Sequence, residues 1–388
     1  MKETGNRKLK FGMIGGGQGS FIGSVHRQAL LMDGQAELVC GAFNTDPQKS
    51  RESGKSLYLP EERSYGSYQE MLEKERNLPE AQRMDFVVIV TPNHAHFEPA
   101  KLALENGFHV VCEKPVTVNT GEAETLQALA KKQNLLFAVT HPYTSYPLLK
   151  EARKMVAAGT LGNIRKVLVE YNQGWLATAL EETGNKQASW RTNPEKAGKA
   201  GSLGDIGTHA FNLADFVTGL ELDELSADIT TFVPNRRLDD DANVLLRFKG
   251  GAKGIITFSQ ICTGEENNIT LRVYGDKGSL QWRQEEPNSL TLRWLDKPRQ
   301  IIRTADPNAL SEEVMQHTRM PMGHPEGLIE AFANLYMNFM GALRMHEAGN
   351  PTNSFEYPTI ADGVRTMQFI DHVLESGGAN SRWTAFNA

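Results

Sequence analysis

Five short apolar runs in the first 143 residues constrain the fold of this chain more than any other feature. They cover residues 9–14, 36–44, 84–93, 109–115 and 135–143. Segments with helical spacing of apolar residues separate these runs, notably 97–106 and 121–133. Because a run that is apolar on both faces suits a parallel sheet covered by helices, the alternation predicts a doubly wound α/β domain.

A glycine-rich turn follows the first apolar run. Gly15 and Gly17 match the first two positions of the pattern G-x-G-x-x-G, and Ser20, another small residue, stands at the third. Between a strand and a helix this pattern holds the pyrophosphate of a dinucleotide, although glycine turns also serve only to reverse a chain. The residues expected to contact a cofactor here are Gly15, Gly17, Gln18, Gly19, Ser20, Phe21 and Ile22.

The end of the second apolar run bears on the choice between NAD and NADP. NAD-binding folds place a carboxylate there to bind the adenosine ribose. This chain has Asn44 and Thr45 instead, and the following Asp46 is better placed to cap a helix that begins at Pro47. We therefore expect Asn44 and Thr45 to contact the cofactor, with NADP slightly favoured over NAD.

Length, charge and cysteine content narrow the class of protein. A chain of 388 residues exceeds the size at which one hydrophobic core stops growing, so we expect two domains, 1–140 and 141–388. A net charge of -6 with scattered basic residues argues against a nucleic-acid surface, and no apolar segment suits a signal peptide or a membrane span. Cys40, Cys112 and Cys262 lie in apolar runs, which predicts free thiols and a cytoplasmic protein.

The second half of the chain has a different pattern. Its predicted strands cover 164–172, 242–248, 253–261 and 268–275. Short glycine-containing turns such as 249–254 and 275–278 join neighbouring strands, which is typical of antiparallel pairing. A mixed or antiparallel sheet is therefore expected in the second domain.

A helical segment at 205–217 carries a polar stripe opposite its apolar face. Asp205, His209 and Asn212 form this stripe, and positions four apart on a helix lie about 5–6 Å from each other. A carboxylate and an imidazole can then act on one surface. The alternative is a solvent-facing stripe in which Asp205 only caps the helix.

A catalytic metal is not expected. Histidines that could be imagined as ligands are His94, His96, His141, His209 and His324. They lack the tight spacing of metal motifs such as H-E-x-x-H. The acidic triplet at 239–241 is interpreted as the start of a hairpin or strand rather than as a site.

Two longer segments carry a family resemblance that extends over nearly the whole chain. Residues 90–116, ending in Glu-Lys-Pro-Val, and residues 201–219, containing Asp-x-x-x-His, resemble the paired signatures of the glucose–fructose oxidoreductase and inositol dehydrogenase (Gfo/Idh/MocA) family. The resemblance implies a Rossmann domain followed by an α/β domain with a large, mostly antiparallel open sheet. It also implies an NAD(P)-dependent oxidoreductase acting on sugars, cyclitols or related polyols, assembled as a homodimer or homotetramer through the second sheet.

The resemblance also assigns roles to individual residues. Glu113, Lys114 and Pro115 occupy the family's Glu-Lys-Pro motif, in which the lysine contacts nicotinamide and substrate, and Asp205 and His209 occupy its Asp-x-x-x-His motif. The segment that resembles the nicotinamide-side loop contributes Thr91, Pro92, Asn93 and His96.

One departure from the family pattern concerns the end of the fifth run. Pro142 stands where many members carry an asparagine, which leaves the contacts of His141 and Tyr143 open. Further substrate-binding candidates are Tyr143, Trp190, Arg191 and His324. For the last three, plain packing or a surface position is an alternative.

These assignments predict hydride transfer between a nicotinamide and a secondary hydroxyl or ketone. His209 would take the hydroxyl proton, because an imidazole titrates near neutrality. Asp205 would hold the imidazole ring or a second substrate hydroxyl, and Lys114 would donate a hydrogen bond to the reacting oxygen. Two alternatives remain at this point: a redox-neutral glycosidase that retains NAD, and a non-enzymatic regulator that senses the dinucleotide.

Overall fold

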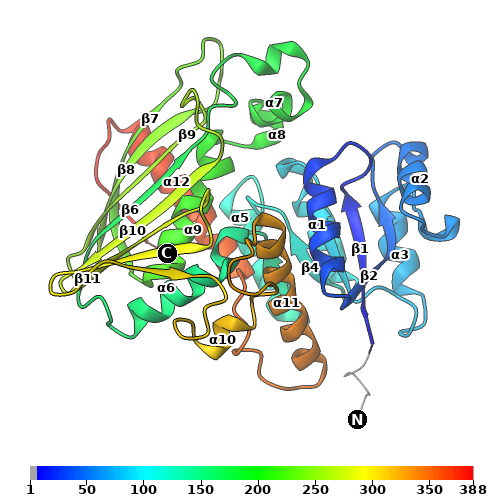
Figure 1. The fold of residues 1–388 in the computed structure, drawn as a ribbon. Helices are drawn as coiled ribbons and strands as arrows, with labels where there is room; N and C mark the ends of the chain where they lie inside the picture. Colours follow the sequence, from blue (N-terminus) through cyan, green and yellow to red (C-terminus); the bar gives the residue numbers. More distant parts are fainter. Residues whose placement is uncertain (1–6, 388) are drawn as a thin grey trace. The chain divides into compact units, whose positions relative to one another are not determined.

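The computed structural model describes residues 7–387, which fold as two compact units (Figure 1). The first unit comprises the described part of Met1–Thr140 together with Phe332–Val364, and the second comprises His141–Ala331 together with the described part of Arg365–Ala388. The expected second domain covers every residue after 140. The structure differs from that expectation for Phe332–Val364.

Packing explains why this late segment belongs to the first unit. The ring of Phe339 meets that of Phe86 edge to face at a centroid distance of 5.3 Å. The backbone N–H of Val139 donates to Pro358 at 2.9 Å, beside a bridge between Ala138 and Thr359. The returning chain thereby satisfies backbone groups at the edge of the first sheet.

The first unit contains a five-stranded parallel sheet of order β2-β1-β3-β4-β5. Its strands are β1 (Leu9–Gly15), β2 (Ala36–Ala42), β3 (Phe86–Val90), β4 (His109–Cys112) and β5 (Phe137–Val139). Its early helices are α1 (Phe21–Met32), α2 (Pro47–Ser56), α3 (Tyr68–Arg76), α4 (Phe97–Glu105) and α5 (Thr120–Gln133). The order reverses beside β1, so the carboxyl ends of β1 and β3 flank the point where doubly wound sheets bind ligands. The predicted Rossmann architecture is confirmed.

The second unit contains a nine-stranded sheet of order β13-β12-β11-β10-β6-β9-β8-β7-β14. Its strands are β6 (Ile164–Asn172), β7 (Leu222–Thr230), β8 (Asp241–Phe248), β9 (Lys253–Ser259), β10 (Asn268–Gly275), β11 (Gly278–Arg283), β12 (Ser289–Trp294), β13 (Gln300–Arg303) and β14 (Thr384–Ala385). All neighbours are antiparallel except β6 and β9, which run parallel. The expected large, mostly antiparallel sheet is confirmed.

Helices cover one face of this sheet. The remaining helices are α6 (Pro147–Ala157), α7 (Lys186–Arg191), α8 (Pro194–Ala197), α9 (Thr208–Thr218), α10 (Glu312–Met315), α11 (Leu328–Glu347) and α12 (Ile360–Gly378). Helix α9 packs on β6, β9 and β10, while α6 packs on β11 and β12. Along β8 the side chains alternate, so that Val244 and Leu246 are buried whereas Leu245 is exposed.

Within residues 7–387 no helix combines the length and apolar character that crossing a bilayer requires.

Candidate functional site

The glycine turn after β1 brings two backbone segments into close contact. A Cβ atom on Gly17 would lie 2.9 Å from the carbonyl oxygen of Phe43 and 2.8 Å from Oγ of Ser53, so only glycine fits there. The side-chain oxygen of Ser20 then caps α1 by accepting from the N–H of Gly23 at 3.2 Å. Strand, close turn and capped helix together form the arrangement that binds phosphate groups at a helix N-terminus.

The end of β2 carries the two polar residues that the sequence analysis selected. Asn44 and Thr45 are exposed, and Asn44 accepts from the backbone N–H of Asp46 at 3.0 Å. Asp46 caps α2 through bonds from the backbone N–H groups of Gln48 and Lys49, with Pro47 at the first helical position. The prediction that Asp46 serves as a helix cap is therefore confirmed.

The loop after β3 is tied to the loop after β4 by His96. Its ring is completely buried and contacts the carbonyl oxygens of Pro115 at 2.9 Å and Thr91 at 2.8 Å. Burial lowers the pKa of His96, so the neutral ring donates to one of these two carbonyls. Asn93 is also buried, in the short 3₁₀ segment Asn93–Ala95, and Pro92 precedes it. His96 thus fixes the relative position of the two loops.

A buried polar network surrounds the Glu-Lys-Pro turn. Glu113 accepts hydrogen bonds from His26 at 2.8 Å, from Thr140 at 2.7 Å and from the backbone N–H of Lys114 at 3.1 Å. The other ring nitrogen of His26 lies 2.5 Å from the hydroxyl of Tyr336. Lys114 itself is half-buried, and its bond to Pro115 is cis.

Opposing effects set the charge of Glu113. Burial alone would raise its pKa, but the hydrogen bond and charge of His26, the charge of Lys114 and the Thr140 hydroxyl outweigh burial and lower the pKa to about 2. Sequence reasoning missed His26 and Tyr336. The available signal was a histidine next to Val25, one of the apolar positions on the inner face of α1.

The second unit places Asp205 and His209 at the start of one helix, but not on a regular α-helix. Leu203–Gly207 forms a π-helical turn in which the N–H of Thr208 donates to the carbonyl of Leu203, and α9 begins only after it. The expectation of ordinary four-residue spacing across this stretch was wrong. The two glycines at 204 and 207 weaken the α-helical preference of the turn, and π turns of this kind recur at functional sites.

His209 lies in an aromatic cluster and is not part of a solvent-facing stripe. Only 7% of its surface is exposed, and its Nδ1 lies 3.2 Å from Nδ1 of His141. The rings of His141 and Tyr143 meet that of His209 edge to face at centroid distances of 5.1 and 5.0 Å. The two residues beside Pro142, whose contacts the sequence left open, therefore both contact His209.

Asp205 is held by two side chains. Its Oδ2 accepts from Nε2 of Gln260 at 2.9 Å and from Nε of Arg191 at 3.2 Å. The guanidinium of Arg191 stacks on Trp190, 4.2 Å from the ring centre, and also lies 5.8 Å from the ring centre of Trp175. The structure thus brings together three residues that the sequence singled out separately, Trp190, Arg191 and Asp205.

Sequence reasoning missed a chain of polar residues at one end of the large sheet. Asn267 accepts from Tyr171 at 2.9 Å and from Gln173 at 2.6 Å, and donates to the hydroxyl of Tyr143 at 3.2 Å. The oxygen of Gln173 accepts from Gln260 at 3.2 Å, which connects this chain to Asp205. The available signal was the placement of amide side chains where strands end or begin. Burial raises the pKa of Tyr143, so its hydroxyl keeps its proton at neutral pH.

His324 has a different position from the other predicted residues. Its side chain is exposed, and its Nδ1 lies 3.2 Å from the carbonyl of Pro321. Nearby, Glu326 accepts from the backbone N–H groups of Arg319 and Met320 at 2.5 and 2.8 Å. These are local contacts that organise a loop.

Across residues 7–387, no group of three or more His, Cys, Asp or Glu side chains is arranged to hold a metal ion.

Comparisons with known proteins cover both units. The model for the oxidoreductase family with an NAD-binding Rossmann fold (GFO_IDH_MocA) matches residues 9–141, and a GFO/IDH/MocA C-terminal domain model matches residues 149–281. The uncharacterized oxidoreductase YfiI of Bacillus subtilis is 33% identical over 386 residues, which cover 98% of each chain. The levoglucosan dehydrogenase of Pseudarthrobacter phenanthrenivorans is 26% identical over 404 residues, covering 97% of each chain.

Solved structures agree with these matches. An inositol dehydrogenase homolog from Azotobacter vinelandii, crystallised with NADH and myo-inositol, superposes with a TM-score of 0.92 at 34% identity over 98% of each chain. The chain belongs to the GFO/IDH/MocA family of oxidoreductases, whose amino-terminal part is an NAD-binding Rossmann fold.

Proposed function

We propose that this protein is an NAD(P)-dependent dehydrogenase that interconverts a secondary hydroxyl and a ketone on a sugar, a cyclitol or a related polyol. The observation that carries the proposal is the cluster around His209, in which an imidazole, two tyrosines and a carboxylate occupy one end of the large sheet. The cyclic polyols named for two relatives support this class of substrate. The side chains of Gln173, Gln260 and Asn267 supply the hydrogen-bonding groups that a polyhydroxylated ring requires.

The residues of the first unit fit a nicotinamide dinucleotide. A side chain at position 17 would fill the space against Phe43 and Ser53, and the capped start of α1 suits a pyrophosphate. Exposed Asn44 and Thr45 without a free carboxylate beside them slightly favour NADP, whereas the relative from Azotobacter vinelandii was crystallised with NADH. Titration with both coenzymes, followed by the fluorescence of the reduced nicotinamide, decides between them.

When bound, a nicotinamide coenzyme would supply the hydride acceptor or donor for the reacting carbon. His209 takes the hydroxyl proton as the carbonyl forms and returns it in the opposite direction. Asp205 holds the substrate through a neighbouring hydroxyl, and Lys114 donates a hydrogen bond to the oxygen on which charge develops. The hydroxyl of Tyr143, protonated at neutral pH, is a further donor beside the imidazole.

A screen of sugars and inositols with both coenzymes tests this function through the absorbance of the reduced nicotinamide. We expect reduction with at least one polyol, and its loss in Lys114→Ala and His209→Ala. Lys132→Ala, which removes an exposed lysine on α5, is the matched control and should retain activity. Substrate turnover without net coenzyme reduction would instead indicate the redox-neutral glycosidase, and coenzyme binding without any turnover would indicate a regulator.

We also infer assembly into a homodimer or homotetramer through the large sheet. Leu245, Ile255 and Leu168 stand side by side on β8, β9 and β6, on the sheet face opposite the buried Val244 and Leu246. Leu245 is 45% exposed and the other two are partly exposed, which is an unfavourable arrangement for an isolated subunit. Sedimentation of the native protein, compared with a Leu245→Glu variant, tests this assembly.

A further inference from the structure

The acidic stretch that leads into β8 has a role that its sequence did not reveal. Asp239 is buried, and both of its carboxylate oxygens are bonded to one distant segment. Oδ1 accepts from the N–H of Gly201 at 2.6 Å, while Oδ2 accepts from the N–H of Leu203 at 2.6 Å and from Oγ of Ser202 at 2.7 Å. A carboxylate that accepts backbone N–H groups makes hydrogen bonds roughly twice as strong as neutral ones.

These donors lie at the start of the helical stretch that carries Asp205 and His209. The first N–H groups of a helix have no partner within the helix, and Ser202 at the N-cap supplies none from its own side chain. Asp239 therefore caps this helix from more than thirty positions away in the chain. A Cβ atom on Gly201 would lie 2.2 Å from the carbonyl oxygen of Asp239, so the close approach requires glycine.

The neighbouring Asp240 holds the partner of Asp205. Its backbone carbonyl accepts from the N–H of Gln260 at 2.9 Å, and the side chain of Gln260 donates to Asp205 at 2.9 Å. Two consecutive residues therefore fix the contact between Gln260 and Asp205. Asp239 holds the helix that carries Asp205 through its carboxylate, and Asp240 holds Gln260 through its backbone carbonyl.

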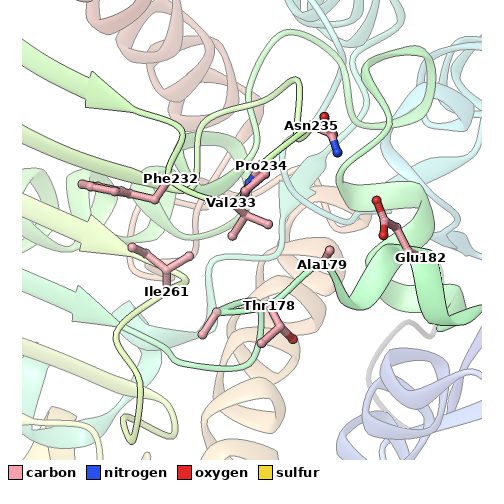
Figure 2. Close-up of a pocket in the computed structure, with 9 residues that line it drawn as sticks. Thr178, Ala179, Glu182, Phe232, Val233, Pro234, Asn235 and Ile261 are labelled. Carbon is pink, nitrogen blue, oxygen red and sulfur yellow. The ribbon is translucent and has the colours of Figure 1, made fainter.

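The side chain of Asp240 also holds two neighbouring loops in place, one directly and one through Arg236. It accepts from the N–H of Phe232 at 2.8 Å and pairs with the buried guanidinium of Arg236 at 3.1 Å. Arg236 in turn pairs with Glu181 and donates to the carbonyl of Thr178. Figure 2 shows the two loops facing each other, where they line a cavity of about 310 Å³.

We propose that Asp239 is a positioning residue that fixes where Asp205 and His209 lie relative to Gln260 and His141, and thereby orients the substrate hydroxyl for reaction. This inference rests on the proposed dehydrogenase function. Because reaction rates fall steeply when a catalytic group moves by about 1 Å, loosening the first turn of the helix slows catalysis without removing any group that touches the substrate.

The principal variant is Asp239→Asn, which keeps the shape but turns an amide N–H₂ toward a backbone N–H. We expect kcat for the polyol to fall by about tenfold or more, while KM changes less and the affinity for the reduced coenzyme stays the same. Ser202→Ala removes one of the three donors and should give a smaller loss in the same direction. It also keeps the test open if Asp239→Asn fails to fold.

A double-mutant cycle with Gln260→Ala separates positioning from plain stabilisation. If both residues act through Asp205, the loss of kcat caused by Gln260→Ala will be smaller in the Asp239→Asn background than in the native protein. Ser67→Ala, which removes the N-cap of α3 in the first unit, is the control for cap loss and should leave kcat unchanged. Additive losses, or an unchanged kcat in Asp239→Asn, would overturn the proposal.

Hydrogen exchange provides a measurement that does not depend on activity. We expect faster exchange in Asp239→Asn for the backbone N–H groups of residues 201–209, with no change in α1. Unchanged exchange in residues 201–209 overturns the positioning role whatever the activity. If the native protein reduces neither coenzyme with any polyol, the dehydrogenase function fails, and exchange alone decides whether Asp239 holds this helix.

Discussion

Glu113 and His26 are hydrogen-bonded at 2.8 Å inside the first unit, although 87 positions separate them in the chain. The imidazole is completely buried and bridges the carboxylate to the hydroxyl of Tyr336. Since Glu113 also accepts from the backbone N–H of Lys114, the network fixes the backbone from which the lysine side chain extends.

Replacing His26 by leucine is therefore expected to destabilise the protein by about 3–5 kcal/mol, because the substitution leaves a buried carboxylate without its principal partner. Urea unfolding measures this loss. Gln28→Ala, at an exposed position on the same helix, should change the free energy of unfolding by less than about 0.5 kcal/mol. A stable His26→Leu protein with native activity would show that the bridge holds neither the fold nor Lys114.

Lowering the pH should reduce the free energy of unfolding, because the buried carboxylate of Glu113 becomes protonated. Its pKa in the folded protein is about 2, below the ordinary value of 4.5, so the folded state binds this proton less readily than the unfolded state. The stability contributed by the carboxylate is then complete above about pH 4.5 and is lost as the pH falls toward about pH 2, at most about 3 kcal/mol in total. Unfolding followed across this range should show a smaller dependence on pH in Glu113→Gln than in the native protein, and equal slopes would contradict the assignment.

Local patterns predicted much of the fold because they depend on neighbouring residues. The apolar run Phe86–Val90 is buried throughout, as an interior parallel strand requires, and Asp46 before Pro47 is a cap that two residues suffice to identify. The glycine turns around β8 to β11 likewise predicted antiparallel pairs.

Such local patterns do not predict contacts between residues that lie far apart in the chain. Nothing near Tyr336 indicates that its hydroxyl meets a ring 310 positions earlier, and nothing near Asp239 indicates that it caps a helix start in another segment. The π turn at Leu203–Gly207 was missed because apolar spacing alone cannot distinguish it from an α-helical turn.

The close contact at Gly17 makes a sharp prediction for coenzyme binding. An alanine there would place Cβ 2.9 Å from a backbone carbonyl oxygen that cannot rotate away, so the turn itself must shift. We expect the affinity for the reduced coenzyme to fall by about tenfold or more and the fold to lose about 1–3 kcal/mol. Gln18→Ala, at the exposed neighbouring position, should keep the native fold. Fluorescence titration with the reduced coenzyme checks the affinity of Gly17→Ala, and urea unfolding compares the stability of the two variants. Tight coenzyme binding by Gly17→Ala would refute the assigned role of the turn.

Variants of Arg191 test substrate binding without changing His209, the proposed proton acceptor. The guanidinium of Arg191 bonds Asp205 and lies over the ring of Trp190, an arrangement that a lysine does not reproduce because its ammonium is a point charge on a flexible stem. If Asp205 must be held in place to bind the polyol, both Arg191→Ala and Arg191→Lys should raise KM by about tenfold while coenzyme affinity stays constant, since each loses the guanidinium that contacts both Asp205 and Trp190. Arg293→Ala, an exposed arginine on β12, is the control and should leave KM unchanged. Native KM in Arg191→Lys would mean that charge alone matters at this position, and native KM in both variants would remove Arg191 from the substrate site.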